Sequence, residues 1–320
     1  MDLYLPKSVI AFTAFLGFVA GFVLLVLMIM WRSRRKGRFS PFTENMFRLP
    51  GHTLRKQISD LSDEFSSTYF IFIISAVAFI GSILFLRDSV RSTAVLCTVV
   101  ILIGSIWKIV QQIGELQILK LGCEGEEYTG QELNLLMRKR AFVFHDIPYK
   151  YGNIDHIVIG NNLIFAIETK AVRKPKKTGS TASRESNVRF DGSVLTFPHF
   201  TTSEPIDQAK IHAKYLQKVI KNRTGVAFKV MPVVAIPGWF IDIDSSGQPD
   251  VLVINPERGK ALRKWLCEVH DRSMRNRVVA YIASVAQSIT PNSNRTDPNA
   301  TEHFDFWLNP KFKEKVLGEE

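Results

Sequence analysis

Two carboxylates and an ammonium, on Asp155, Glu168 and Lys170, are the side chains of this 320-residue sequence whose types and spacing best suit chemistry. A pair of carboxylates can hold Mg²⁺, which prefers oxygen ligands and keeps several of its waters. A metal held there polarises a phosphate ester and activates a bound water. A lysine ammonium beside it can stabilise the negative charge that develops during attack. The residue types therefore suit metal-dependent cleavage of a phosphodiester.

Two strands must position these side chains. Apolar runs over residues 153–159 and 163–170 read as strands, with a Gly-Asn-Asn turn between them that suits a hairpin. Because strand side chains alternate between faces, Glu168 and Lys170 share one face at the polar end of the second run. Charges on an otherwise buried strand must be solvated, paired or metal-bound. An ion pair between Glu168 and Lys170 without a metal is therefore the competing interpretation.

The surrounding pattern predicts an α/β fold in which a mixed sheet is flanked by helices. The expected helices cover residues 115–140, with glycine interruptions, 205–220, 256–270 and 276–288. Further strands are expected over residues 142–147, 188–190, 193–197, 230–236 and 251–254, with polar loops over 172–188 and 242–250. Helix, three strands, helix and strand in this order are typical of a metal-dependent phosphodiesterase core.

Four short motifs support that interpretation when they are taken together. In chain order they are Gly122-x-x-Gly125-Glu126, Ile154-Asp155-His156, Ile167-Glu168-Thr169-Lys170 and Pro205-x-x-Gln208-Ala209-x-x-His212. This ordered set resembles the nuclease-related domain called NERD, a family assigned to the PD-(D/E)xK nuclease superfamily, over roughly residues 122–220. The resemblance implies a restriction-endonuclease-like core.

The resemblance also implies roles for individual residues. Asp155 and Glu168 would be the ligands of Mg²⁺ or Mn²⁺, and Lys170 would be the catalytic lysine. Glu126 would add an acidic group from the first helix, and Gln208 would project a polar group from the second core helix towards the site. From the residues themselves, His145, His156 and His212 are expected to support the fold rather than to react, since none has a spacing that demands a ligand.

A basic segment follows Lys170, where the family often continues with an aromatic-Gly turn and this chain has Ala171-Val172. Its cations can neutralise the phosphates of DNA or RNA beside the site. The alternatives are a solvated surface loop and a contact with anionic lipid. The candidate nucleic-acid-binding residues are Arg173, Lys174, Lys176 and Lys177.

Residues 1–114 read as a membrane region and residues 115–320 as the nuclease-like domain with a C-terminal extension. Long uncharged runs predict spans over about 8–30, 68–86 and 92–110, the last of which contains Lys108, a lysine that can reach the interface. The first run is too long for a cleaved signal peptide. Gly17 and Gly21 form a Gly-x-x-x-Gly pattern, which indicates a homo-oligomer.

Basic residues predict the orientation. The loop after the first run is rich in arginine and lysine, which favours the cytoplasmic side. The nuclease-like domain then lies in the cytoplasm, at the inner membrane of a bacterial-type cell. Three cysteines without a CxxC pair fit a reducing compartment and exclude a disulfide framework.

Two functions of different classes follow from these observations. The first is a membrane-anchored, Mg²⁺-dependent nuclease that hydrolyses DNA, with RNA as the alternative substrate. The second is a membrane scaffold that keeps the nuclease fold and binds nucleic acid or a protein without catalysis. The net charge of +11 permits either function.

Overall fold

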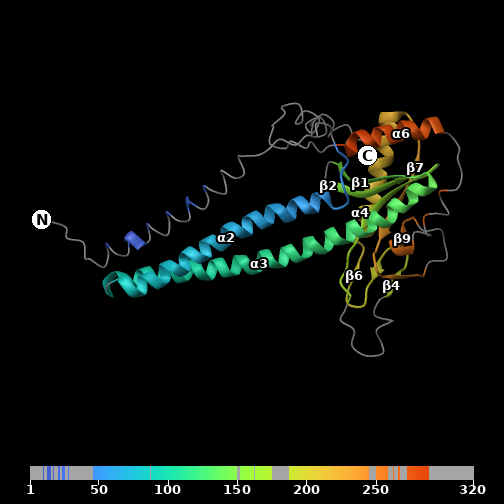
Figure 1. Cartoon of the computed structure of the whole chain (residues 1–320). Coiled ribbons are helices and arrows are strands. Elements are labelled where there is room, and N and C mark those ends of the chain that lie inside the picture. Colours follow the sequence, from blue (N-terminus) through green and yellow to red (C-terminus); the bar gives the residue numbers. More distant parts are fainter. Residues whose placement is uncertain are drawn as a thin grey trace, which may run out of the picture. The chain divides into compact units, whose positions relative to one another are not determined.

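The computed structural model describes residues 46–287 apart from 87, 150–151, 162, 175–186, 245–249, 259–261, 263–265 and 267–271, together with residues 10, 13–15, 17, 21, 24–25 and 28. The chain forms two compact units (Figure 1). The first comprises residues 1–40 and 56–119, and the second comprises residues 41–55 and 120–320.

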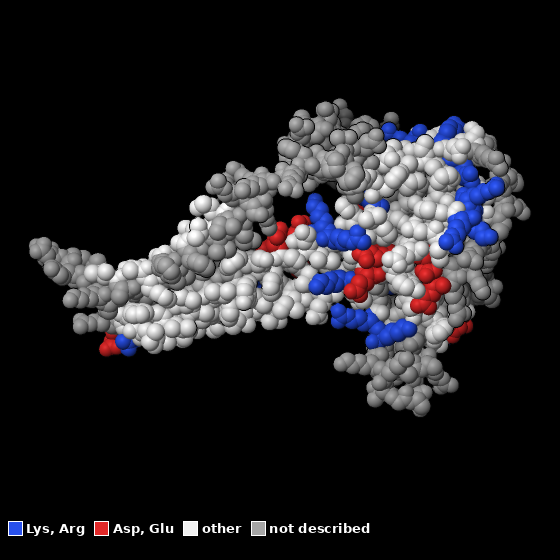
Figure 2. All heavy atoms as spheres, viewed as in Figure 1, with Lys and Arg blue, Asp and Glu red and all other residues white. Residues whose placement is uncertain are grey.

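The first unit is built mainly from α2 (His52–Phe85) and α3 (Asp88–Asn134), each of which extends into the second unit. Both helices are long and apolar enough to cross a membrane. Only 22% and 6% of their apolar stretches are buried, unlike the core helix of a soluble domain. The described atoms of this unit form a mainly uncharged surface in Figure 2. The expected span 68–86 lies within α2 apart from Leu86, and the expected span 92–110 lies within α3. The expected span 8–30 lies mostly outside the described residues.

Polar side chains within these two helices find partners locally. The hydroxyls of Ser75, Ser82 and Ser105 donate hydrogen bonds to carbonyls three or four residues earlier in their own helices. Such bonds satisfy a hydroxyl without help from solvent. Lys108, which we expected to reach the interface, forms an ion pair with Glu64 at 2.9 Å.

A five-stranded mixed sheet organises the second unit, in the order β1-β2-β3-β7-β9. The strands are β1 (Phe142–Tyr149), β2 (Gly152–Ile159), β3 (Leu163–Thr169), β7 (Lys229–Ala235) and β9 (Leu252–Ile254). The first three are antiparallel neighbours, and β7 and β9 continue the sheet in parallel with β3. The α4 helix (Glu204–Thr224) connects the parallel strands β3 and β7 after a smaller sheet. The predicted α/β architecture is confirmed.

Side-chain alternation on β3 creates two cores. Ile164 and Ala166 pack with α4 and α6 (Arg272–Ala286), whereas Phe165 and Ile167 pack with the end of α3 and with η1 (Leu135–Lys139). Helical elements therefore cover both faces of the sheet, and β3 is buried on both sides. Glu168 continues the face that α4 covers, as its position in the sequence predicted.

A smaller four-stranded sheet lies in the order β6-β5-β4-β8. Its strands are β6 (Thr201–Thr202), β5 (Leu195–Thr196), β4 (Asn187–Phe190) and β8 (Phe240–Ile243). The antiparallel β4–β5 pair was expected. The β8 strand was missed, and the polar loop predicted from residue 242 begins too early, because β8 pairs in parallel with β4 from a distant part of the sequence.

Glycines do not interrupt α3, contrary to expectation. The helix is continuous to Asn134 and then tightens into η1. A Cβ on Gly125 would lie 2.5 Å from Cβ of Ala171, and one on Gly130 would lie 2.4 Å from Cγ of Pro50. These glycines allow close packing, which offsets their helix propensity penalty of about 1 kcal/mol each. The helix expected over residues 256–270 begins as η3 (Pro256–Arg258), beyond which most residues lie outside the described part.

Candidate functional site

The register of β2 and β3 sets Asp155 beside Glu168. His156 pairs with Ile167, so the next position along the two antiparallel strands brings Asp155 opposite Glu168. The backbone N–H of Thr169 donates a hydrogen bond to Oδ2 of Asp155 at 2.8 Å. This bond fixes the carboxylate at the end of β3. The hairpin therefore brings together the two carboxylates predicted to bind a metal.

These two carboxyl groups lie in a buried environment. Burial raises the pKa of Asp155 well above its usual range, and the negative charge of Glu168 raises it further. Burial raises the pKa of Glu168 to about 7, although the ammonium of Lys170 opposes this change. Each carboxylate thus disfavours ionisation of its neighbour. A divalent cation between them would relieve that repulsion.

Glu126 extends the acidic cluster from α3. The side chain is 7% exposed, and its carboxylate accepts a hydrogen bond from the backbone of Gly51. Burial raises its pKa to about 9, with further contributions from the charges of Asp155, Asp146 and Glu168. The other oxygen, Oε2, has no hydrogen-bond partner among the described residues. The structure therefore brings Glu126 to the predicted site and leaves one of its oxygens available there.

Lys170 lies at the more open side of the cluster. Its Nζ is 3.4 Å from Oε2 of Glu204, the first residue of α4, and 35% of the lysine side chain is exposed. Lys170 thus forms its ion pair with Glu204 on α4 and not with Glu168. A partly exposed ammonium beside buried carboxylates can reach an incoming phosphate.

One face of α4 borders the end of β3. Glu204, Gln208 and His212 follow one another at intervals of four residues, so they share a face of the helix. Glu204 contacts Lys170, and Nδ1 of His212 lies 3.2 Å from Oε2 of Glu168. The half-buried Gln208 lies between these two residues along the same face of the helix, and its part in the site stays a prediction.

His212 was expected only to support the fold, yet it adjoins the carboxylate cluster. Burial lowers its pKa to about 4, so the imidazole is neutral at pH 7 and its contact with Glu168 is not an ion pair at that pH. Nε2 lies 3.1 Å from the hydroxyl of Tyr149. Nδ1 lacks a hydrogen-bond partner within the described part of the chain.

His145 and His156 form a separate buried pair. Their Nδ1 atoms lie 2.9 Å apart, and Nε2 of His145 lies 3.1 Å from Oδ1 of Asn134. An amide oxygen only accepts, so His145 carries its proton on Nε2 and accepts at Nδ1 from His156. Burial lowers the pKa of both rings, most strongly for His156. The pair joins β1, β2 and α3, a structural role that matches expectation.

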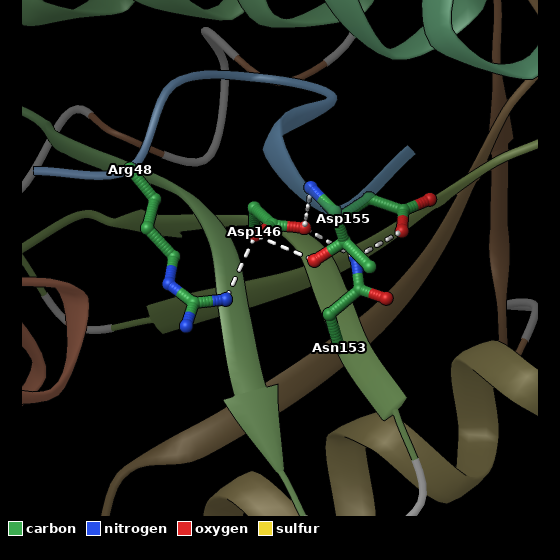
Figure 3. A network of polar contacts seen from close by, with 5 residues as sticks. Arg48, Asp146, Asn153 and Asp155 are labelled. Carbon is green, nitrogen blue, oxygen red and sulfur yellow. Dashed lines mark hydrogen bonds and ion pairs between the residues drawn. The ribbon is translucent and has the colours of Figure 1, made fainter. Parts of the chain in front are cut away.

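Asp146 is a buried acid that sequence reasoning missed. It is fully buried in the middle of β1, and its φ of 51° is unusual for a residue other than glycine. The β1–β2 register pairs His145 with His156 and Ile147 with Ile154, which sets Asp146 opposite Asp155 at the intervening position. The available signal was a single acidic residue inside a mainly apolar strand. Figure 3 shows Asp146 beside Asp155, Asn153 and Arg48.

The candidate nucleic-acid-binding residues are only partly described. Arg173 and Lys174 are exposed beyond β3, and Nζ of Lys174 lies 6.0 Å from the centre of the Trp239 ring. The indole N–H of Trp239 donates to the carbonyl of Val172 at 3.1 Å, which anchors the start of the segment. Lys176 and Lys177 lie outside the described residues.

The donor set fits Mg²⁺ or Mn²⁺ better than a metal that needs an all-protein cage. Among the described residues, no group of three or more His, Cys, Asp or Glu side chains is placed to enclose a metal ion. Mg²⁺ is commonly held by one or two carboxylates and retains waters, which matches the pair Asp155 and Glu168. The unpartnered Oε2 of Glu126 and Nδ1 of His212 are buried polar atoms that such waters would satisfy.

Comparison with known families agrees with this arrangement. The family model of the nuclease-related domain, NERD, matches residues 121–237. The match includes the helix end that carries Glu126, the hairpin with Asp155, Glu168 and Lys170, and the α4 helix with Gln208. Comparison with curated proteins and with solved structures found no match. Residues 121–237 of this chain therefore form a nuclease-related domain, as the ordered motifs predicted.

Proposed function

We propose that this protein is a membrane-anchored nuclease that hydrolyses phosphodiester bonds with the help of Mg²⁺ or Mn²⁺. The observation that carries the proposal is the pair formed by the buried Asp155 and the half-buried Glu168, opposed across a hairpin of the nuclease-related domain, with Lys170 beside it. Repulsion within this pair is what a divalent cation would offset. A purely structural ion pair would not require a second buried carboxylate.

Each residue has a distinct part in the proposed reaction. Asp155 and Glu168 would hold the metal, which would polarise the phosphate and activate a water. Lys170, with its partly exposed ammonium, stabilises the negative charge on the attacked phosphate. Glu126 and Gln208 accept hydrogen bonds from waters in the site or donate hydrogen bonds to them. Nδ1 of the neutral His212 lies 3.2 Å from the carboxylate of Glu168 and borders the site.

The proposed substrate is DNA, with RNA as the alternative. The exposed cations Arg173 and Lys174 lie shortly after β3, the strand that carries Glu168, so they can contact phosphates next to the scissile bond. Such contacts are independent of sequence. Lys176 and Lys177 would extend the same basic segment.

We propose further that α2 and α3 cross the inner membrane and that the nuclease-related domain lies in the cytoplasm. The support is their length, their apolar and largely unburied surface, and the basic residues around positions 32–56. Gly17 and Gly21 have open space beside their Cα atoms among the described residues, which suits a homo-oligomer formed through the first span. Cysteine labelling from each side of the membrane tests the orientation.

The test of catalysis uses the full chain in detergent micelles. Plasmid DNA, single-stranded DNA and RNA are incubated with Mg²⁺, Mn²⁺ or a chelator. Asp155→Asn and Lys170→Met should each reduce cleavage by about 100-fold or more, as expected for removal of one charge-stabilising group. Asp207→Asn, which alters an exposed acid in the first turn of α4, should cleave like the wild type.

Two results would contradict the proposal. Cleavage that survives both site variants would place the activity elsewhere. Nucleic-acid binding without cleavage, and without Mn²⁺ binding in calorimetry, would favour the non-catalytic scaffold.

A further inference from the structure

Asp146 receives an unusually complete set of hydrogen bonds. Nη1 of Arg48 donates to Oδ2 at 3.0 Å, and the hydroxyl of Thr53 donates to the same oxygen at 2.9 Å. The backbone N–H of Thr53 and Nδ2 of Asn153 donate to Oδ1 at 3.3 and 2.8 Å. Figure 3 shows this network converging on Asp146. Each oxygen of the buried carboxylate thus has two donors.

The donors offset the burial of a negative charge. A buried carboxylate without partners is strongly unfavourable. The Arg48 guanidinium, whose side chain is only 14% exposed, supplies a charge-assisted bond. Thr53 lies in the first turn of α2, where free backbone N–H groups favour an anion. The hydrogen bonds from Arg48, Thr53 and Asn153 therefore compensate the burial of Asp146.

Asn153 connects this network to the proposed metal ligand. Its Nδ2 donates to Oδ1 of Asp146 at 2.8 Å and lies 3.5 Å from Oδ1 of Asp155. The other oxygen of Asp155 accepts from the backbone of Thr169. Asn153 and Thr169 thus hold the Asp155 carboxylate from two sides, and Asp146 orients the Asn153 amide.

The segment Arg48–Thr53 also reaches the second acid of the cluster. The backbone of Gly51 donates a hydrogen bond to Glu126. Gly51 has a φ of 71°, and a Cβ there would lie 3.0 Å from Sγ of Cys123. A glycine is thus required where the segment passes α3. This segment lies outside residues 121–237, which match the family.

We propose that the segment Arg48–Thr53 is a working part of the site, because it fixes Asp146 and thereby positions Asp155 for metal binding. Arg48, Asp146 and Asn153 are positioning residues, which act through Asp155 and do not touch the substrate. The inference rests on the proposed function, since it concerns the same metal ligands. It adds a requirement for residues 68 to 73 positions upstream of the family match, which begins at residue 121.

The experiment measures Mn²⁺ binding by the full chain in detergent, by calorimetry or by electron paramagnetic resonance. Arg48→Gln and Asn153→Ala should each weaken Mn²⁺ binding by about 10- to 100-fold, the usual effect of losing a partner behind a metal ligand. Arg48→Lys, which keeps the charge, should restore part of the loss. The matched control is Arg55→Gln, because Arg55 lies in the same stretch but pairs with Glu127 at 2.7 Å, away from Asp146.

Turnover separates positioning from substrate binding. The two positioning variants should lower kcat at saturating nucleic acid and limiting metal, while KM for nucleic acid stays near the wild-type value. If Arg48→Gln does not fold, Asn153→Ala decides the question, since it leaves Asp146 paired with Arg48 and Thr53.

Three outcomes overturn a proposal. Mn²⁺ binding by folded Asn153→Ala that equals binding by Arg55→Gln would overturn the positioning role. Mn²⁺ binding by the wild type without cleavage of any nucleic acid would refute the proposed function and leave the positioning role supported by its variants. A wild type that does not bind Mn²⁺ would overturn both.

Discussion

Replacement of Glu126 by glutamine should stabilise the metal-free protein at neutral pH. Burial and the nearby charges of Asp155, Asp146 and Glu168 raise the pKa of Glu126 from 4.5 to about 9. The folded state therefore holds a proton that the unfolded chain releases between these values. Stability contributed by this proton is fully present below the unfolded pKa and is lost as pH rises from about 4.5 to 9.

The size of the effect follows from the pKa difference. At pH 7, which lies about 2.5 units above the pKa of 4.5 in the unfolded chain, the ionisation of Glu126 on unfolding lowers the free energy of unfolding by roughly 3 kcal/mol. A neutral glutamine of similar shape does not titrate, so it removes this penalty. At about 2 to 4 °C per kcal/mol, the variant should melt about 6 to 12 °C higher at pH 7 and only slightly differently at pH 5.

The assay is thermal unfolding of both proteins in the same detergent with a chelator, at intervals from pH 5 to 9. The matched control is Glu127→Gln, the adjacent residue on α3, whose pKa is lowered by its hydrogen bond to Arg55. That variant should be slightly less stable at pH 7, because it loses a partly exposed ion pair. If Glu126→Gln and the wild type show the same dependence on pH, the carboxyl is ionised in the folded state and the reasoning is refuted.

Three further predictions concern packing and reactivity. Gly125→Ala should destabilise the protein by about 1 to 3 kcal/mol in thermal unfolding, because its Cβ would lie 2.5 Å from Cβ of Ala171. The control Gly114→Ala, with open space around it, should be neutral or stabilising. Equal melting temperatures for the two variants would contradict this close approach. Cys123 should resist iodoacetamide at pH 8 until the protein is denatured, because burial raises its pKa to about 11, and rapid labelling detected by mass spectrometry in the folded protein would show this to be wrong. Trp239→Phe should destabilise the protein by about 1 kcal/mol in denaturant unfolding, because it loses the hydrogen bond to Val172. Ile236→Val, in the same core, is the comparison for lost packing alone. An unchanged midpoint for Trp239→Phe would show that the bond contributes nothing.

Local patterns predicted the hairpin and the helix beside it well. The alternation along residues 163–170 was sufficient to place Glu168 and Lys170 on one face, and the apolar spacing along α4 identified its buried side. Ordered motifs brought in Glu126 and Gln208 from distant parts of the chain. These features depend on short-range periodicity, which a single sequence displays directly.

Features that depend on long-range pairing were missed. The β8 strand exists because it pairs with β4, and nothing in residues 240–243 alone demands a strand. Asp146 gains its importance from Arg48 and Thr53, which lie more than 90 residues earlier. His212 reaches Glu168 only because α4 packs along β3. The available signal was the four-residue interval between Gln208 and His212, which places both residues on one face of α4.

Residues 41–55 belong to the same compact unit as residues 120–320, and the apolar helices lie between these two parts of the chain. The nuclease-related unit is thus discontinuous in sequence. During synthesis its first segment emerges before the two long helices, and its partner Asp146 on β1 emerges after them. The acidic site can be completed only when the two ends of the stretch that contains these helices have met, which carries an entropic cost. A fragment that starts after α3 would lack Arg48 and Thr53, so Asp146 would lose their hydrogen bonds. Such a fragment would be missing part of the interior of the domain.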